Sequence, residues 1–193
     1  MKDKENRFNE VLREKILALP YDLKICFAIM ADEDCDREVR LLAAGTALYV
    51  LGPNDIIPDH IMPVGYADDA IILWAALDRI RTQHPEVAAK FSERFDGIID
   101  RAGETVEAFS AYLGKVFDWM LAKVPSLPEL VYKGKKAAEY IEDPEAGVFL
   151  YEEGLAFVTD FDLDEDYLAN ALRGRKVLEA LTKRIEEEEA RRK

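Results

Sequence analysis

The sequence predicts an all-α protein, a compact multi-helix bundle, and three observations lead to this prediction. Apolar residues recur at helical spacing along most of the chain. No β-hairpin signal and no alternating stretch of strand length stands out. Hydrophobic residues make up 49% of the 193 positions, which is enough to fill a large core.

Proline and glycine divide this periodicity into helices. Pro20 should end a first amphipathic helix, Asp36 can cap the helix that follows the turn at 31–36, and Pro85 should start a new helix. A bend is expected near Gly97 or Gly103. The helices predicted in this way cover residues 5–18, 21–31, 37–51, 67–83, 86–124, 128–142, 145–158 and 165–190, with 157–163 extended as an alternative.

Residues 52–66 should form a proline-rich connector between two apolar helices, a helical hairpin. Pro53, Pro58 and Pro63 each fix their own φ and push the preceding residue out of the helical region. Gly52 suits a left-handed position that ends the first helix. Gly65 suits a tight turn or close packing before the second.

The chain is expected to divide into a helical domain at 1–125 and an acidic helical extension at 126–193 that packs on it. The boundary falls within "VPSLPEL", which breaks the helical pattern at 124–130. A chain of this length exceeds the common domain size of about 100–150 residues.

Charge and cysteine content restrict the partners and the cellular compartment. A net charge of −13 argues against nucleic acid, because phosphate binding needs clustered Lys and Arg, and against electrostatic docking to anionic lipid. The apolar runs are too short for a transmembrane helix. Cys26 and Cys35 match no metal or disulfide pattern, so a soluble, cytoplasmic protein is expected, with peripheral membrane contact as an alternative.

The aspartates of "GPNDIIPDHIMPVGYADDA" have structural uses. Asp55 and Asp59 can accept hydrogen bonds within their own turns. Asp68 and Asp69 fall in the first turn of the helix at 67–83, where free amides and the helix dipole favour negative charge. The favoured interpretation is therefore a packed turn in which each carboxylate accepts from nearby amides, with no catalytic residue.

The chemical alternative is a divalent cation. Asp55, Asp59, His60, Asp68 and Asp69 would supply carboxylate oxygens and one imidazole, a set that suits Mg²⁺, Mn²⁺ or Fe. Neighbouring side chains on a helix point about 100° apart, so at most one of the last two should face a shared ion. The favoured expectation is that the protein has no cofactor.

The stretch "LYVLGPNDIIPDHIMPVGYADDAIILWAAL" at 48–77 resembles the signature of the YkvA-like family, a bacterial domain of unknown function. Pro63 stands one position later than in the commonest form of that signature, and His60 replaces an apolar residue. The resemblance covers only 37–83. It implies a helical hairpin and a frequent description as membrane-associated, but no particular reaction. The matching residues are Tyr49, Pro53, Asp55, Ile57, Pro58, Asp59, Gly65, Asp68 and Asp69.

An acidic band follows in the second half of the chain. No Lys or Arg occurs between Lys136 and Arg173, whereas the last 21 residues are rich in both. The two segments either form separate solvated faces, which is favoured, or lie against each other. The candidate interaction residues of the band are Glu142, Glu145, Glu152, Glu153, Asp160, Asp162 and Asp164.

Three functions of different classes remain open. The favoured one is a non-catalytic protein-interaction or scaffold module, which would use the acidic band or an exposed apolar groove to bind an unidentified protein. The second is a metal-dependent enzyme centred on the motif aspartates. The third is a membrane-peripheral protein whose hairpin at 41–77 contacts the bilayer or a membrane partner.

Overall fold

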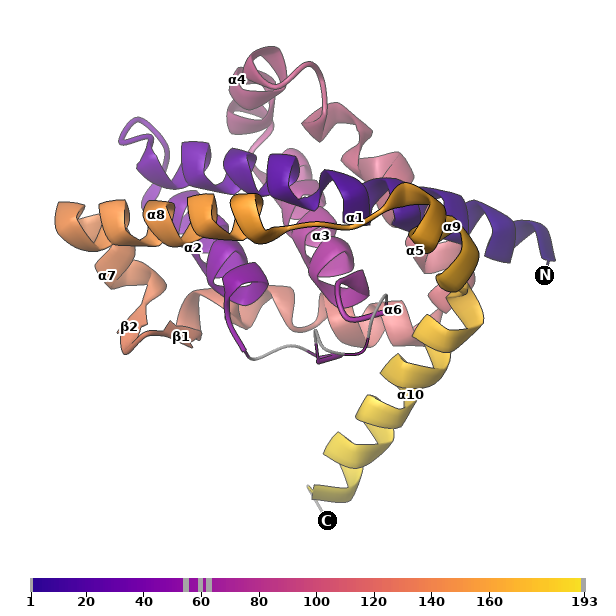
Figure 1. The fold of residues 1–193 in the computed structure, drawn as a ribbon. Helices are drawn as coiled ribbons and strands as arrows, with labels where there is room; N and C mark the ends of the chain where they lie inside the picture. Colours follow the sequence, from indigo (N-terminus) through magenta and orange to yellow (C-terminus); the bar gives the residue numbers. More distant parts are fainter. Residues whose placement is uncertain (1, 54–55, 59–60, 62–63, 192–193) are drawn as a thin grey trace.

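The computed structural model describes residues 2–53, 56–58, 61 and 64–191, and within them it is a helical bundle, which confirms the all-α prediction (Figure 1). The first half contains α1 (Lys2–Ala31), α2 (Arg37–Leu51), α3 (Ala67–Gln83), α4 (Pro85–Arg94), η1 (Ile99–Arg101), α5 (Ala102–Leu113) and α6 (Lys115–Leu121). The second contains η2 (Val124–Glu129), β1 (Val131–Tyr132), β2 (Lys135–Lys136), α7 (Ala137–Glu142), α8 (Pro144–Asp160), α9 (Glu165–Ala171) and α10 (Gly174–Arg191).

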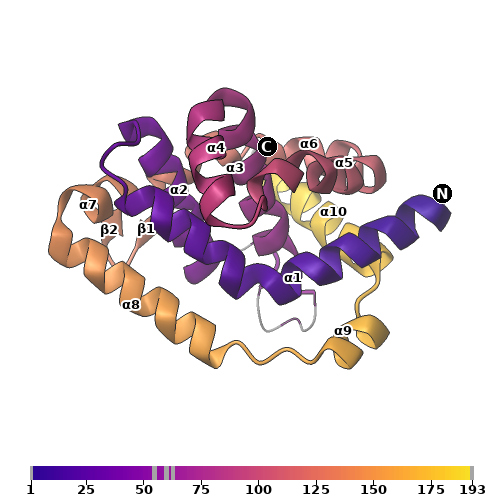
Figure 2. The same ribbon diagram turned by 90° about the horizontal axis from the view of Figure 1, so that it is seen from above.

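The first helix does not end at Pro20, so the prediction of two helices at 5–18 and 21–31 is wrong. Pro20 lies inside one continuous helix, α1, which bends about halfway along its length (Figure 2). Leu19 and Leu23 on either side of the proline are fully buried. Their burial outweighs the one helical hydrogen bond that proline removes, and a bend relieves the clash of its ring.

Helix α1 is the axis of the bundle. It contacts α2, α3 and α5 along one side and α8 along another, and α8 runs beside it in both views (Figures 1 and 2). Helices α2 and α3 begin and end at the predicted residues, and most of their side chains are buried. Asp36 holds the N-cap position of α2, but its side chain makes none of the expected capping hydrogen bonds. No described helix has the length and apolarity needed to cross a bilayer.

The segment predicted as one helix at 86–124 is divided by residues with positive φ. Asp96 and Gly97 have φ of 53° and 71° after α4, so the break expected near Gly97 is found there. Gly114, with φ of 54°, separates α5 from α6. Gly103 lies inside α5 and causes no bend. Left-handed backbone cannot continue a right-handed helix, which explains both breaks.

A small hairpin replaces the start of the helix predicted at 128–142. β1 and β2 pair antiparallel, and the two residues between them, Lys133 and Gly134, have φ of 46° and 85°. Positive φ at both central positions is the geometry of a type I′ turn. The lysine in the first position hid this turn from sequence analysis, because Asn or Asp is the usual signal there. Only Ala137–Glu142 of the predicted range is an α-helix.

The C-terminal segment is two helices instead of one. α9 ends at Ala171, and α10 starts at Gly174, whose N–H donates to the side chain of Asn9 on α1 at 2.6 Å. A Cβ at Gly174 would come within 2.8 Å of the Phe8 ring. This close approach to α1 fixes the turn between the two helices. The four residues at 161–164 that precede α9 are not helical, in partial agreement with the extended alternative for 157–163.

The second half of the chain covers α2. η2 and α7 both lie against this helix. At Gly45 the contact is with backbone, and a Cβ there would stand 2.5 Å from the Leu127 carbonyl carbon and 2.7 Å from the Pro128 nitrogen. The domain boundary predicted at 125/126 falls inside η2 and stays a prediction.

A carboxyl group, that of Asp22, is buried at the α1–α3 contact beside the buried Lys15. Asp22 is 1% exposed and accepts a hydrogen bond from the Trp74 indole N–H at 2.9 Å. The Lys15 ammonium lies over the same indole, 4.0 Å from the ring centroid. Burial raises the pKa of Asp22 to about 7, although Lys15 and the indole hydrogen bond act to lower it.

We expect the free energy of unfolding to fall as the pH rises from 4 to 8. Because the pKa of Asp22 is higher in the folded state than its usual value of 3.8, its contribution is complete below about pH 4 and is lost through pH 7. The loss from this one group amounts to up to about 4 kcal/mol. Urea unfolding at several pH values should show a shallower slope for Asp22→Asn than for the wild type. The control is the same substitution at the exposed Asp100, which should leave the slope of the wild type unchanged. Equal slopes for the wild type and Asp22→Asn would contradict the prediction.

Candidate functional site

The proline-rich connector is bracketed by helix ends at both sides, as predicted. α2 ends at Leu51 and α3 begins at Ala67. Short turns organise the described part of the connector: the N–H of Ile61 donates to the Pro58 carbonyl, and the N–H groups of Val64 and Gly65 both donate to the Ile61 carbonyl, each at 2.9 Å.

The carboxylate of Asp68 ties this connector to both helices. Its Oδ2 accepts from the Tyr49 hydroxyl at 2.6 Å and from the backbone N–H groups of Ile56 and Ile57 at 2.7 and 3.2 Å. Asp68 is fully buried and belongs to α3, whereas Tyr49 belongs to α2. One oxygen atom therefore joins α2, the connector and α3.

Burial dominates the electrostatics of this group. Desolvation raises the pKa of Asp68, while the hydrogen bonds from Tyr49, Ile57 and Ile56 act to lower it. The pKa of the Tyr49 hydroxyl is raised well above its usual value, first by burial and then by the nearby charges of Asp68 and Asp69. Tyr49 therefore stays protonated and can donate to the carboxylate.

One detail of the predicted connector is wrong, and a second needs an addition. Gly52 has φ of −94° and is extended, not left-handed; glycine is needed there because a Cβ would stand 2.5 Å from the Leu48 carbonyl oxygen. Asp68 lies in the first turn of α3, where its own backbone N–H acts on the carboxylate, but the hydrogen bonds that position the connector come from outside this turn. Its Oδ2 atom accepts hydrogen bonds from the N–H groups of residues eleven and twelve positions earlier, because the side chain is enclosed between the helices instead of facing solvent.

Asp69 is also fully buried in the first turn of α3. Pro53 and Pro58 are exposed, and Ile57 is buried beneath the connector. Four residues of the motif lie outside the described residues, namely Asp55, Asp59, His60 and Pro63. Three of them are among the five candidate metal ligands. Within residues 2–53, 56–58, 61 and 64–191, no cluster of three His, Cys, Asp or Glu side chains could hold a metal. The metal alternative stays a prediction.

The Asp68 carboxylate joins α2 and α3. These two helices overlap the part of the chain that matches a family model. Residues 39–75 match a family model described as "Protein of unknown function (DUF1232)". No curated protein and no solved structure matches the chain. The DUF1232 segment runs from the first turn of α2, through the connector, into α3, and it includes both Tyr49 and Asp68.

Outside the DUF1232 segment, several members of the acidic band have partners within the chain, and its role as an interaction surface stays a prediction. Glu142 pairs with Arg37, and Glu153 with Lys133 of the hairpin turn. Asp164 accepts from the N–H of Tyr167 and caps α9. Asp160 and Asp162 are exposed at the end of α8 and after it. α8 and the basic C-terminal helix α10 lie apart in both views, so the acidic and basic segments do not face each other (Figures 1 and 2).

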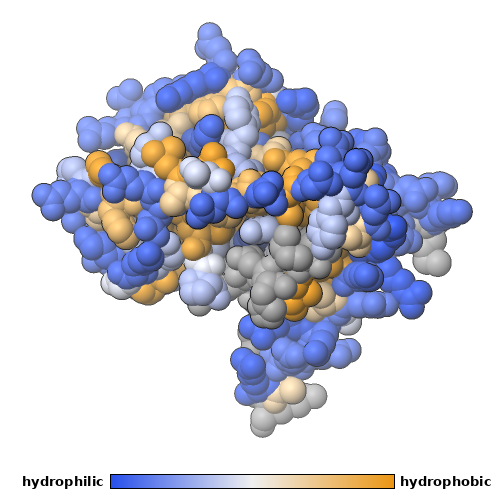
Figure 3. Space-filling model, in the orientation of Figure 1, coloured by the Kyte–Doolittle hydropathy of each residue, from blue (hydrophilic) through white to orange (hydrophobic). Residues whose placement is uncertain are grey.

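The structure reveals a hydrophobic groove between α1 and α8. Val148, Tyr151 and Leu155 of α8 are 59%, 49% and 45% exposed, and they follow one another at i, i+3 and i+7. Figure 3 shows hydrophobic surface over these two helices, among charged side chains. We call it the α1–α8 groove, and its defining residues are Tyr21, Lys24, Phe27, Ala28, Ala31, Val148, Tyr151 and Leu155.

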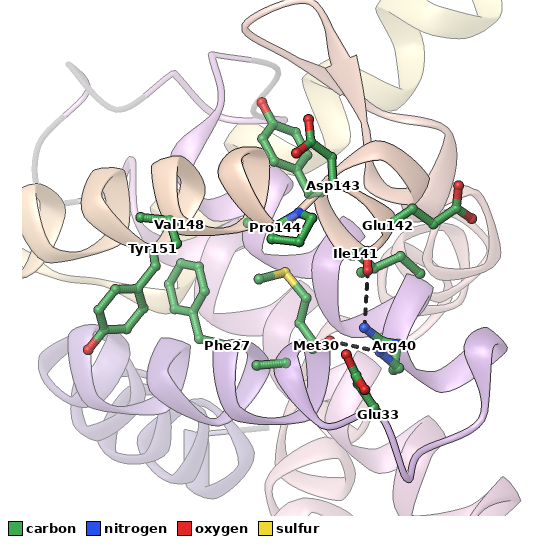
Figure 4. Close-up of a pocket in the computed structure, with 13 residues that line it drawn as sticks. Phe27, Met30, Glu33, Arg40, Ile141, Glu142, Asp143, Pro144, Val148 and Tyr151 are labelled. Carbon is green, nitrogen blue, oxygen red and sulfur yellow. Dashed lines mark hydrogen bonds between the residues drawn. The ribbon is translucent and has the colours of Figure 1, made fainter.

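Tyr151 divides the groove into two hollows. Its ring stands edge-on to that of Phe27, with centroids 5.6 Å apart. On one side a hollow of about 360 Å³ reaches Met30 and Ile141 (Figure 4). On the other side a hollow of about 420 Å³ reaches Tyr21 and Phe95. Gly154 of α8 packs on the Phe27 ring, and since a side chain there would overlap the ring, the two helices approach closely.

The two rims of the groove carry opposite charge. Glu145 and Glu152 stand beside the apolar stripe of α8, and no ion pair in the described part of the chain includes them. Lys24 and Arg94 line the opposite rim at its Tyr21 end, whereas Glu33 lines the hollow at the Met30 end. Arg40, at the end of the groove, is occupied, because its guanidinium donates to the backbone carbonyls of Met30 and Ile141 (Figure 4).

Sequence analysis did not single out this groove, although it named an exposed apolar groove as one interaction surface. The signal lay in "GVFLYEEGLAFV", where apolar residues occupy more of the helix than one buried face requires. Only Ala146, Leu150 and Gly154 of α8 are buried. Phe157 packs against the core, but the exposed Val148, Tyr151 and Leu155 are in excess of what one buried face requires.

Proposed function

We propose that the protein is a non-catalytic helical module that binds another protein through the α1–α8 groove. The observation that carries the proposal is the exposed stripe of Val148, Tyr151 and Leu155, which the rest of the described chain does not cover. Tyr151 borders both hollows and Val148 borders the one that reaches Met30. Large exposed apolar patches rimmed by polar residues are typical of interaction sites. Aromatic residues such as Tyr151 are enriched at the centre of such interfaces.

The arrangement around Asp68 supports a structural role for the motif. Its raised pKa makes it the motif group best suited to proton transfer. Three donors already converge on its Oδ2, however, and two of them are backbone amides that hold the connector in place. A carboxylate with this task positions a loop between two helices.

We further propose that the DUF1232 segment belongs to the YkvA-like family and that the protein is a bacterial cytoplasmic one. The spacing of Tyr49, Gly65, Asp68 and Asp69 supports the family assignment. Both cysteines are free and buried, which suits a reducing compartment.

A photo-crosslinking residue placed at Val148 tests the binding function in cells that express the protein. We expect a discrete adduct with one partner protein, absent when the same residue replaces exposed Glu107 on distant α5. The purified partner should then bind the wild type saturably and bind Leu155→Asp at least ~10-fold more weakly, because a buried unpaired charge is costly at an interface. Equal adducts at both positions, or equal affinity for Leu155→Asp, would count against the proposal.

A further inference from the structure

The shape of the α1–α8 groove fits a helix. The hollow that Tyr21 and Tyr151 line is also lined by the small side chains of Ala28 and Ala31, which leave room between the two aromatic rings. A third, small hollow of about 20 Å³ lies beside Leu155 and Val158. With it, the lining of the groove along α8 runs from Pro144 to Val158, which corresponds to about 21 Å or four helical turns. An amphipathic helix placed in such a groove buries side chains at i, i+3, i+4 and i+7.

The charges beside the groove are available for a partner. Glu145 and Glu152 precede and follow Val148 at helical spacing, so they lie along the same side of α8. Lys24 and Arg94 lie on the other rim, and none of these four residues takes part in an ion pair within the described part of the chain. The groove therefore has a negative rim along α8 and, opposite it at the Tyr21 end, a positive rim.

A second copy of the chain is a poor occupant. No Lys or Arg occurs between Lys136 and Arg173, so α8 of another copy could place its acidic flank against Lys24 and Arg94 but has no basic flank to place against Glu145 and Glu152. An interface that leaves these two glutamates without opposite charge is the less favourable one. A partner with basic residues would instead meet the α8 rim with opposite charge.

We infer that the occupant of the α1–α8 groove is an amphipathic helix of the partner protein, with Lys or Arg along the flank that faces α8 and Asp or Glu along the flank that faces Lys24 and Arg94. This inference rests on the proposed function and specifies the partner's chemistry. The two rims also fix the direction in which the helix lies, because reversing it would place each flank against a like charge.

Three designed 16-residue helical peptides test the inference with the full chain. All share one leucine stripe, and their two flanks are basic and acidic, both acidic, or both basic. In fluorescence anisotropy at low salt, the peptide with one basic and one acidic flank should bind at least ~10-fold more tightly than either other peptide, and added salt should reduce this difference. Equal affinities for all three peptides would overturn the inference.

Charge reversal on α8 sharpens the test. Glu145→Lys with Glu152→Lys should make both rims basic, so the peptide with two acidic flanks should become the tightest ligand. The control reverses Glu104 and Glu107, exposed glutamates on α5, and should leave the order of affinities unchanged. An unchanged order in the α8 variant would overturn the inference, as would self-association of the wild type that Leu155→Asp abolishes. If the crosslinked partner of Val148 binds but no peptide does, the groove binds a protein and only the helix assignment fails.

Discussion

Replacing Gly45 by alanine is expected to lower the free energy of unfolding by about 2–3 kcal/mol, measured by urea denaturation. The new Cβ would stand 2.5 and 2.6 Å from the carbonyl carbon and oxygen of Leu127. These are backbone atoms of η2, so they cannot rotate away as the end of a side chain can. The expected loss is opposite in sign to the usual effect of this substitution, because alanine normally stabilises a helix interior by about 0.5–1 kcal/mol relative to glycine.

Gly103→Ala is the matched control for this substitution. Gly103 also lies inside a helix, α5, but the atoms nearest to its added Cβ belong to the Arg81 guanidinium, the first of them at 2.9 Å. A long side chain can move by this amount, so this variant should be as stable as the wild type or more stable. If both alanine variants gain stability, the α2–η2 contact is looser than the structure describes.

Replacing Asp68 by alanine should be at least as damaging, with a loss of about 3–5 kcal/mol at neutral pH, because three buried donors lose their acceptor and each costs about 1–3 kcal/mol. The donors are the Tyr49 hydroxyl and the amides of Ile56 and Ile57. Hydrogen exchange should show these two amides well protected in the wild type and rapidly exchanging in Asp68→Ala.

Asp68→Asn separates the hydrogen bonds from the volume of the side chain. The amide oxygen can still accept from Tyr49 and the connector, so this variant should lose less stability than Asp68→Ala and keep part of the amide protection. Tyr49→Phe removes only the hydroxyl donor and should have the smallest effect of the three. Protected Ile56 and Ile57 amides in Asp68→Ala would mean that other contacts hold the connector.

The parts of the fold that sequence predicted well are those where apolar periodicity and helix-breaking residues agree. α2 and α3 were placed to the residue because proline and glycine bound two strongly apolar stretches. Pro20 misled the prediction because tertiary burial of Leu19 and Leu23, which is not visible locally, outweighs a lost hydrogen bond. The hairpin at Lys133 and Gly134 was missed because lysine rarely takes positive φ.

The site was also predicted only in part, because sequence spacing shows local patterns and does not show contacts between distant parts of the chain. Spacing identified Tyr49 and Asp68 as members of one motif, but it could not show that Asp68 accepts from Ile56 and Ile57 across a loop of the chain. The α1–α8 groove joins residues more than a hundred positions apart, such as Phe27 and Tyr151. Only the folded chain brings two such stripes together.

The contact between Gly45 and η2 also affects the order of events during synthesis. The chain leaves the ribosome from its N-terminus, and domains fold once their contacts are complete. α2 and α3 emerge early, yet the backbone that covers Gly45 belongs to Leu127 and Pro128. Until that stretch has been translated, the nascent protein presents an uncovered apolar helix, which is the kind of surface that chaperones recognise.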